Sequence, residues 1–169
     1  TIKHFACNNQ EDNRMGSDSV LSERALREIY LKGFEIAVKN SQPMSIMTSY
    51  NQINGVHAAN AYDICTKAAR DEWGFAGAIM TDWTTTTAST AGVCTAAGCM
   101  RAGNDMVMPG VKADHDNIRQ ELKEGTLEPG ALQRCICNTV SLALQSNQYE
   151  EAVSYSSQFD GLGTYMTVD

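Results

Sequence analysis

The sequence of 169 residues has no apolar run that approaches the roughly 20 residues of a membrane-spanning helix. It also lacks an excess of positive charge, since 20 acidic residues outnumber 13 basic ones and the formal net charge is -7. Phosphate backbones and anionic lipid surfaces require clustered lysine and arginine. The composition therefore argues against nucleic acid and against a membrane as partners.

The sequence also lacks the spacing of a metal site. It has no Cys-x-x-Cys pair, and its three histidines lie far from any pair of cysteines, which argues against zinc. We expect neither a metal nor another cofactor.

Disulfides and glycosylation have little support. The six cysteines are scattered through segments with helix or strand patterns, which favours free, mostly buried thiols, with a disulfide as the alternative. No Asn-x-Ser/Thr sequon is present. These two features favour a cytoplasmic location but do not assign a compartment.

What the sequence does contain is an alternation of short apolar runs with helical segments. Hydrophobic residues make up 43% of the chain, enough for a core, and the length predicts one domain or part of one. The apolar runs predict four strands, at residues 2–7, 45–50, 78–82 and 105–108. Helical patterns predict helices at 22–40, 61–72, 89–101, 116–124 and from Pro129 onward. Polar segments predict loops at 8–18, 51–55 and 84–87.

Two of the predicted helices have a clear apolar face. In the first helix, the residues at helical spacing are Leu26, Ile29, Tyr30, Gly33 and Ala37. In the last helix, they are Leu132, Ile136, Val140, Ala143 and Leu144. Each set predicts the face that packs against the rest of the fold.

The order of strands and helices predicts the fold class. Strands that are joined through helices pair in parallel. Four parallel strands with polar groups at their carboxyl ends fit half of a (β/α)8 barrel, which needs about 250 residues when complete. We therefore predict an α/β fold, a partial TIM barrel over residues 1–148, followed by a linker or arm over residues 149–169.

Three of the predicted strands end in residues that could form a site. These residues are Lys3 and His4, then Tyr50, then Asp82 with Trp83. Taken singly, Asp82 could be a helix N-cap, the Lys-His pair a surface feature and Tyr50 a packing residue. Strand ends converge on one mouth of a barrel, so together the residues predict one shared site.

A site of this composition suits sugar recognition, because charged groups bind hydroxyls and the apolar face of a sugar stacks on tryptophan. An ionised Asp82 could attack an anomeric carbon, and Lys3 nearby would favour its charged form. A lyase that uses Lys3 as a Schiff base is a weaker alternative, since nothing nearby in the sequence would desolvate that amine.

Six segments, in order, carry a resemblance to a known family: KHFACNNQE (3–11), SERALREIY (22–30), MTSYN (47–51), RDEWGF (70–75), MTDW (80–83) and GNDMVMPG (103–110). Over about residues 1–145, the sequence resembles the second half of the barrel domain of family 3 glycoside hydrolases, the β-glucosidase and β-xylosidase type. The resemblance implies retaining β-glycoside hydrolysis with Asp82 as nucleophile. It also implies that Lys3 and His4 hold sugar hydroxyls, that Tyr50 lies beside the nucleophile and that Trp83 forms the wall of the sugar subsite.

The resemblance further implies that parts of the enzyme lie outside this chain. The family's barrel begins before the Lys-His strand, and its β-glucosidases take an acid/base from a separate α/β sandwich domain. A β-N-acetylglucosaminidase branch carries its acid/base in a Pro-Gly-His-Gly loop, whereas residues 6–9 here read ACNN. We expect the chain alone to be inactive. Its expected partners are a β-linked glucoside or oligosaccharide, and the missing barrel half with the sandwich domain, or a second copy in a homo-oligomer.

Three points stay open at this stage. A non-catalytic sugar-binding or assembly module would keep the pocket without the reaction. The sequence does not distinguish glucose from xylose as the sugar. Asp105 lies in a matching strand, where a structural role is at least as well supported as a role in the site.

Overall fold

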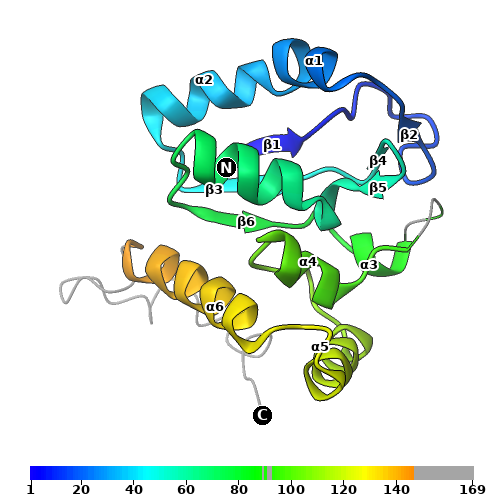
Figure 1. The fold of residues 1–169 in the computed structure, drawn as a ribbon, viewed down its shortest axis with the longest axis vertical. Helices are drawn as coiled ribbons and strands as arrows, with labels where there is room; N and C mark the ends of the chain where they lie inside the picture. Colours follow the sequence, from blue (N-terminus) through cyan, green and yellow to red (C-terminus); the bar gives the residue numbers. More distant parts are fainter. Residues whose placement is uncertain (89, 91–92, 147–169) are drawn as a thin grey trace, which may run out of the picture.

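The computed structural model describes residues 1–88, 90 and 93–146, so the predicted arm over 149–169 lies outside the described residues. The main sheet contains β1 (Ile2–Phe5), β3 (Ser45–Thr48) and β6 (Ala78–Met80), which are parallel in the order β1-β3-β6 (Figure 1). This arrangement confirms parallel pairing in an α/β fold.

The predicted fourth strand, at 105–108, is reduced to one parallel bridge between Met106 and Met80. Beyond this bridge the pairing is irregular: the N–H of Met108 donates to Oγ1 of Thr81 at 2.9 Å, and the N–H of Thr84 donates to the Met108 carbonyl at 2.8 Å. The fourth position in the sheet is therefore occupied by an irregular segment. It still fixes the carboxyl end of β6, since the N–H of Thr81 donates to the Met106 carbonyl at 2.9 Å.

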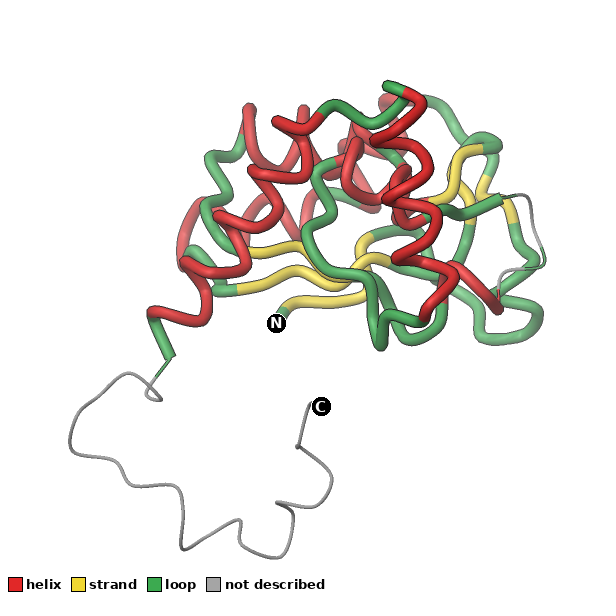
Figure 2. Tube along the Cα trace, turned by 90° about the horizontal axis from the view of Figure 1, so that it is seen from below, coloured by secondary structure: helices red, strands yellow, loops and turns green. Residues whose placement is uncertain are grey.

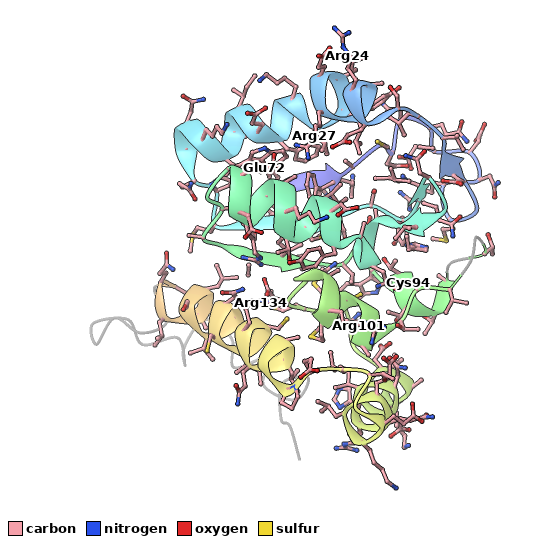
Figure 3. The ribbon with its side chains drawn as sticks, in the orientation of Figure 1. Arg24, Arg27, Glu72, Cys94, Arg101 and Arg134 are labelled. Atoms are coloured by element: carbon pink, nitrogen blue, oxygen red, sulfur yellow. The ribbon has the colours of Figure 1, made fainter. Side chains whose placement is uncertain are left out.

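Helices connect the strands and cover one side of the sheet, as Figure 2 shows. The helices are α1 (Glu23–Ala25), η1 (Leu26–Tyr30), α2 (Lys32–Ser41), η2 (Ala58–Asn60), η3 (Asp63–Glu72), α3 (Thr85–Ala88), α4 (Ala96–Ala102), α5 (Lys112–Glu124) and α6 (Pro129–Leu144). Arg27 and Glu72 face one another between the first helical segment and η3, with Nη1–Oε2 at 2.6 Å (Figure 3). No helix within the described ranges is long and apolar enough to cross a membrane.

The predicted face of the first helix is wrong in part, because a π-turn interrupts the helix. The N–H of Leu31 donates to the Leu26 carbonyl at 2.8 Å, five residues back. One extra residue in a turn rotates everything downstream by about 100°. As a result, Leu31 and Val38 are buried, whereas Gly33 is exposed and Ile29 is 67% exposed.

A small second sheet replaces part of two predicted loops. It contains β2 (Asp18–Ser19) parallel to β4 (Gln52–Ile53), which pairs with β5 (Val56–His57) in an antiparallel hairpin. The hairpin turn is Asn54-Gly55, with φ of 50° and 82°. Asn-Gly is the strongest short-range signal for a two-residue hairpin, because both positions need positive φ.

The remaining corrections concern helix starts. Residues 85–88 form α3 where a loop was predicted, and α4 begins at Ala96 instead of 89. Helix α5 begins four residues earlier than predicted, at Lys112, because Asp114 accepts the N–H of Val111 at 2.9 Å and closes the first turn. Pro129 does open α6 in its first turn, as predicted.

The core lies between the helices and the sheet. Its largest fully buried side chains include Phe5, Ile46 and Ile79 from the strands and Leu31 from the first helical layer. A second cluster lies beneath α4, α5 and α6 and contains Met100, Leu127 and three of the cysteines. All six cysteines are free thiols, of which five are buried and Cys137 is exposed.

Both lateral edges of the main sheet carry apolar side chains that no described element covers. Beside β1, Ile2, Ile29 and Phe34 line a groove of about 530 Å³. Beside Met106, a second groove of about 270 Å³ runs along α6. The predicted apolar face of α6 is accordingly only partly packed, with Ile136, Val140 and Leu144 at least 49% exposed.

His57, in β5, gives the chain a testable pH dependence of stability. It is 2% exposed, and burial lowers the pKa of its imidazole below the ordinary value of 6.5. The unfolded chain therefore binds the proton more readily, so the free energy of unfolding should decrease as the pH falls from 6.5 toward the folded pKa. Urea unfolding at a series of pH values should show this slope in the parent chain and a flatter one in His57→Gln. The matched change in the exposed His115, His115→Gln, should retain the slope; equal slopes in all three proteins would contradict the assignment.

Candidate active site

Asp82 lies at the carboxyl end of β6, and its carboxylate is held by two groups. Oδ1 accepts the backbone N–H of Trp83 at 2.7 Å, and Oδ2 lies 3.3 Å from Nε2 of His4. The side chain is 14% exposed, against 26% for His4. These two contacts orient the acid, while part of it stays open to a ligand.

His4 reaches this position through an irregularity in β1. Ile2 is in register with Ile46 and Phe5 with Thr48, so three steps along β1 match two steps along β3. Such a bulge bends a strand and re-aims its side chains. Beyond the bulge the ladder resumes, with the N–H of Ser49 donating to the Phe5 carbonyl at 2.8 Å.

Tyr50 follows β3 and lies against the same backbone segment. Its hydroxyl donates to the Trp83 carbonyl at 2.6 Å, and the residue is 4% exposed. Burial raises the pKa of Tyr50, and the negative charge of Asp82 raises it further. The phenol therefore stays protonated at neutral pH and remains a hydrogen-bond donor.

Arg14 is a neighbour of this cluster that the sequence analysis missed. Its guanidinium carbon lies 4.8 Å from the centre of the Tyr50 ring, and Nη1 bonds Oε2 of Glu11 at 2.8 Å. The residue lies in the irregular segment after β1, where no periodic pattern points to a position. The one sequence feature that could have indicated Arg14 is that it is the single basic residue in the polar loop after the Lys-His pair.

Buried hydroxyls and amides fix the strand ends beneath the site. Oγ1 of Thr85 donates to the Asp82 carbonyl at 2.9 Å, and Oγ1 of Thr48 donates to the Met80 carbonyl at 3.3 Å. Asn104, which is fully buried, donates to Oγ1 of Thr48 at 3.0 Å. The Thr85 bond closes the turn after Asp82, and the Thr48 and Asn104 bonds join β3 to β6 and to the segment before Asp105, so the backbone that carries Asp82 is held in place.

Asp105 is a structural residue, in agreement with the role weighed for it from the sequence. Its side chain is fully buried, and Oδ2 accepts both Nη2 of Arg70 at 2.5 Å and the N–H of Ile79 at 2.8 Å. Asn138 of α6 donates to Oδ1 at 2.9 Å. Burial raises the pKa of Asp105, and the Arg70 charge opposes that rise. The pair ties η3, β6 and α6 together below the site.

Lys3 and Trp83 are placed differently from the other predicted site residues. Lys3 is exposed, lines the groove beside β1 and forms no ion pair with Asp82. Trp83 is 57% exposed, so its ring is open to a ligand while its backbone holds Asp82 and Tyr50. The structure therefore brings together His4, Tyr50, Asp82 and Trp83, and it leaves Lys3 outside their contacts.

The arrangement presents one oriented carboxylate, an imidazole, a phenol donor and an exposed indole. Such a set can bind the hydroxyls of a polar ligand and stack on its apolar face. In the part of the chain that the structure describes, no group of three or more His, Cys, Asp or Glu residues could hold a metal ion.

Comparison with known proteins identifies a matching family profile and several relatives of this chain. The profile of the "Glycosyl hydrolase family 3 N terminal domain" matches residues 1–137. A β-glucosidase of Ruminococcus albus is 44% identical over 154 residues, which cover 87% of this chain and 16% of that protein. An exo-α-(1→6)-L-arabinopyranosidase of Bifidobacterium breve is 42% identical over 143 residues, or 84% of this chain and 18% of the relative.

Solved structures agree with the fold. β-Glucosidase 3B of Thermotoga neapolitana, in complex with α-D-glucose, superimposes with a TM-score of 0.76 at 42% identity. The match covers 84% of this chain and 20% of that one, so the chain spans about a fifth or less of these three relatives. The α/β half-barrel predicted from the strand order is thereby confirmed. The chain belongs to family 3 of the glycosyl hydrolases, and residues 1–137 correspond to part of that family's N-terminal domain.

Proposed function

We propose that the complete protein hydrolyses β-glycosides with retention of configuration and that Asp82 is the nucleophile. The observation that carries this proposal is the position of the Asp82 carboxylate. It lies at a strand end, is partly open, and is fixed by the N–H of Trp83 and by His4. Membership of a glycosyl hydrolase family supplies the reaction class.

In this reaction, an oxygen of Asp82 attacks the anomeric carbon as the glycosidic bond breaks, and a covalent glycosyl ester forms. An acid from outside this chain protonates the leaving oxygen. It then removes a proton from the water that hydrolyses the ester. Retention requires the two carboxyl groups to lie about 5–5.5 Å apart. Because Trp83 and His4 already hold the carboxylate, it needs little reorganisation on the way to the transition state.

The proposed substrate is a β-linked glucoside or a short oligosaccharide. The exposed ring of Trp83 would stack on the apolar face of the sugar, and His4 beside Asp82 would bond its hydroxyls. The same role for Lys3 would require its exposed side chain to turn away from the groove beside β1. Arg14, held over Tyr50, is a further candidate for a hydroxyl contact. The names of the relatives include a glucosidase and an arabinopyranosidase, so the choice of sugar is left to experiment.

The proposed partners are the protein elements that complete the barrel and supply the acid. The grooves beside β1 and along α6 lie at the two edges where further strands would pair. Within one longer protein, the remaining barrel strands would pair with these edges and a sandwich domain would supply the acid. A homo-oligomer that closes a pseudo-barrel is the alternative, and mass measurements at several concentrations distinguish the two.

The direct test is covalent trapping. A host chimera is made in which this chain replaces the matching segment of the R. albus β-glucosidase. A 2-deoxy-2-fluoro β-glucoside with an activated leaving group should inactivate the chimera and leave one sugar on Asp82, as peptide mass mapping will show. The slow hydrolysis of the fluorinated ester makes the intermediate visible.

Two other outcomes have definite meanings. A label on a different carboxylate would overturn the assignment of Asp82. Glucose binding without a label and without turnover, in a folded chimera, would support the sugar-binding or assembly module instead. The chain alone should hydrolyse aryl β-glucosides negligibly, because it contributes the nucleophile without the acid.

A further inference from the structure

The start of α4 places two thiols together through its capping geometry. Thr95 is the N-cap residue, and its Oγ1 accepts the N–H of Gly98 at 3.0 Å. In such a cap, the residue before the N-cap packs against the fourth helical residue as a hydrophobic staple. Those two positions are Cys94 and Cys99. The same cap geometry therefore directs these two side chains toward each other.

The surroundings of the two thiols agree with this geometry. Cys94 is 6% exposed and Cys99 is fully buried, and both belong to the apolar cluster beneath α4, α5 and α6. Figure 3 shows Cys94 at the start of α4. The neighbouring Cys94 thiol and burial raise the pKa of Cys99 well above its usual range, which agrees with this placement.

Asn60 holds both ends of the staple in place. Its Nδ2 donates to Sγ of Cys99 at 3.1 Å and to the Thr95 carbonyl at 3.1 Å. Its Oδ1 accepts the N–H of Thr95 at 3.0 Å. A single side chain from η2 thus fixes the residue after Cys94 and the sulfur of Cys99, which limits how far the two thiols can separate.

We propose that Cys94 and Cys99 form an oxidisable dithiol that closes into a disulfide across the cap of α4 when it meets a low-molecular-weight disulfide such as oxidised glutathione. The thiolate of Cys94 attacks one glutathione sulfur, and one glutathione leaves as its thiol. The thiolate of Cys99 then attacks Sγ of Cys94 and releases the second glutathione. Two protein thiols and one glutathione disulfide give one protein disulfide and two glutathione thiols, so atoms and electrons balance.

The order of attack follows from exposure. Cys94 is 6% exposed whereas Cys99 is fully buried, and Val93 beside Cys94 is 80% exposed, so the oxidant reaches Cys94 first. Cys99 is fully buried and its pKa is raised, so its thiolate is scarce and its attack on Cys94 is the slower, second step. Among the other thiols, Cys65 donates to the Ala58 carbonyl at 3.7 Å, and Cys137 is exposed on α6. Cys137 should give only a mixed disulfide with glutathione.

The test measures which disulfide forms. The full chain and the host chimera are reduced, treated with oxidised glutathione and mapped by peptide mass. Under native conditions, the Cys94–Cys99 disulfide should exceed every other protein pairing by about tenfold, because the fold holds the two thiols at high effective concentration. In concentrated urea, the same treatment should give a mixture of pairings. Dithiothreitol should reverse the native product.

Variants separate this proposal from general thiol oxidation. Cys94→Ser should abolish the native disulfide and leave Cys99 reduced, whereas Cys137→Ser should remove the mixed disulfide without affecting the Cys94–Cys99 bond. Slower amide exchange at Gly98 in the oxidised protein would show that the cap is covalently closed. A native product that joins Cys99 to Cys65, or equal distributions in urea and in buffer, would overturn the proposal.

Discussion

Replacing Asp82 with asparagine in the host chimera is expected to lower kcat for an aryl β-glucoside by about 10⁴-fold or more, the scale on which loss of a catalytic nucleophile is felt. The amide has the size of the carboxylate, and its oxygen can still accept the Trp83 N–H now 2.7 Å from Oδ1. It has no negative charge with which to form a glycosyl ester. KM should change little, because contacts to the sugar hydroxyls remain.

The matched control is Asp116→Asn, which removes the same charge from an exposed position on α5. It should keep the activity of the parent. Far-UV circular dichroism and gel filtration of both variants establish that the site variant is folded. Activity of Asp82→Asn within tenfold of the parent would mean that another group attacks the sugar. Asp82 would then be one of the strand-end caps that the sequence also allowed.

The strand ends were the part of the site that the sequence could predict. A buried run followed by an acid and an aromatic residue places both at the carboxyl edge of a parallel sheet. The structure indeed sets Asp82 against Trp83, His4 and Tyr50. The functional roles of these residues stay predictions. Arg14 was not predicted, because its position depends on an irregular loop with no period.

Other features escaped the sequence analysis for identifiable physical reasons. The π-turn at 26–30 changes the phase of the helix without changing its composition, so a search for 3.6-residue spacing chose Ala37 instead of its buried neighbour Val38. The Asn54-Gly55 hairpin carried a recognisable turn signal, but its strands are only two residues long. The apolar face of α6 is partly exposed because, among the described residues, no element covers the sheet edge beside Met106.

Arg70→Met is expected to lower the free energy of unfolding by about 3–5 kcal/mol, because it leaves the fully buried Asp105 without its cation. Arg70 also donates to the carbonyls of Gly77 and Gly103, each at 3.0 Å, so the turns that precede β6 and Asp105 also lose a donor. Urea unfolding of the chain, followed by circular dichroism, measures the change. The control is Arg27→Met, which breaks a pair whose side chains are at least 40% exposed and should cost about 1 kcal/mol or less.

The pH dependence of the Arg70→Met variant distinguishes an uncompensated charge from a simple packing defect. Burial already raises the pKa of Asp105, and loss of the Arg70 charge should raise it further. A folded pKa above the unfolded value means that the carboxyl favours folding at low pH and that this contribution is lost as the pH rises through the folded pKa. The variant should therefore come closer to the parent in acid than at neutral pH.

Adding Asp105→Asn to Arg70→Met should restore much of the lost stability at neutral pH, since the amide oxygen can still accept the Ile79 N–H. A stability loss that is equal at all pH values, and unchanged in the double variant, would show that packing of the arginine stem rather than charge governs this contact.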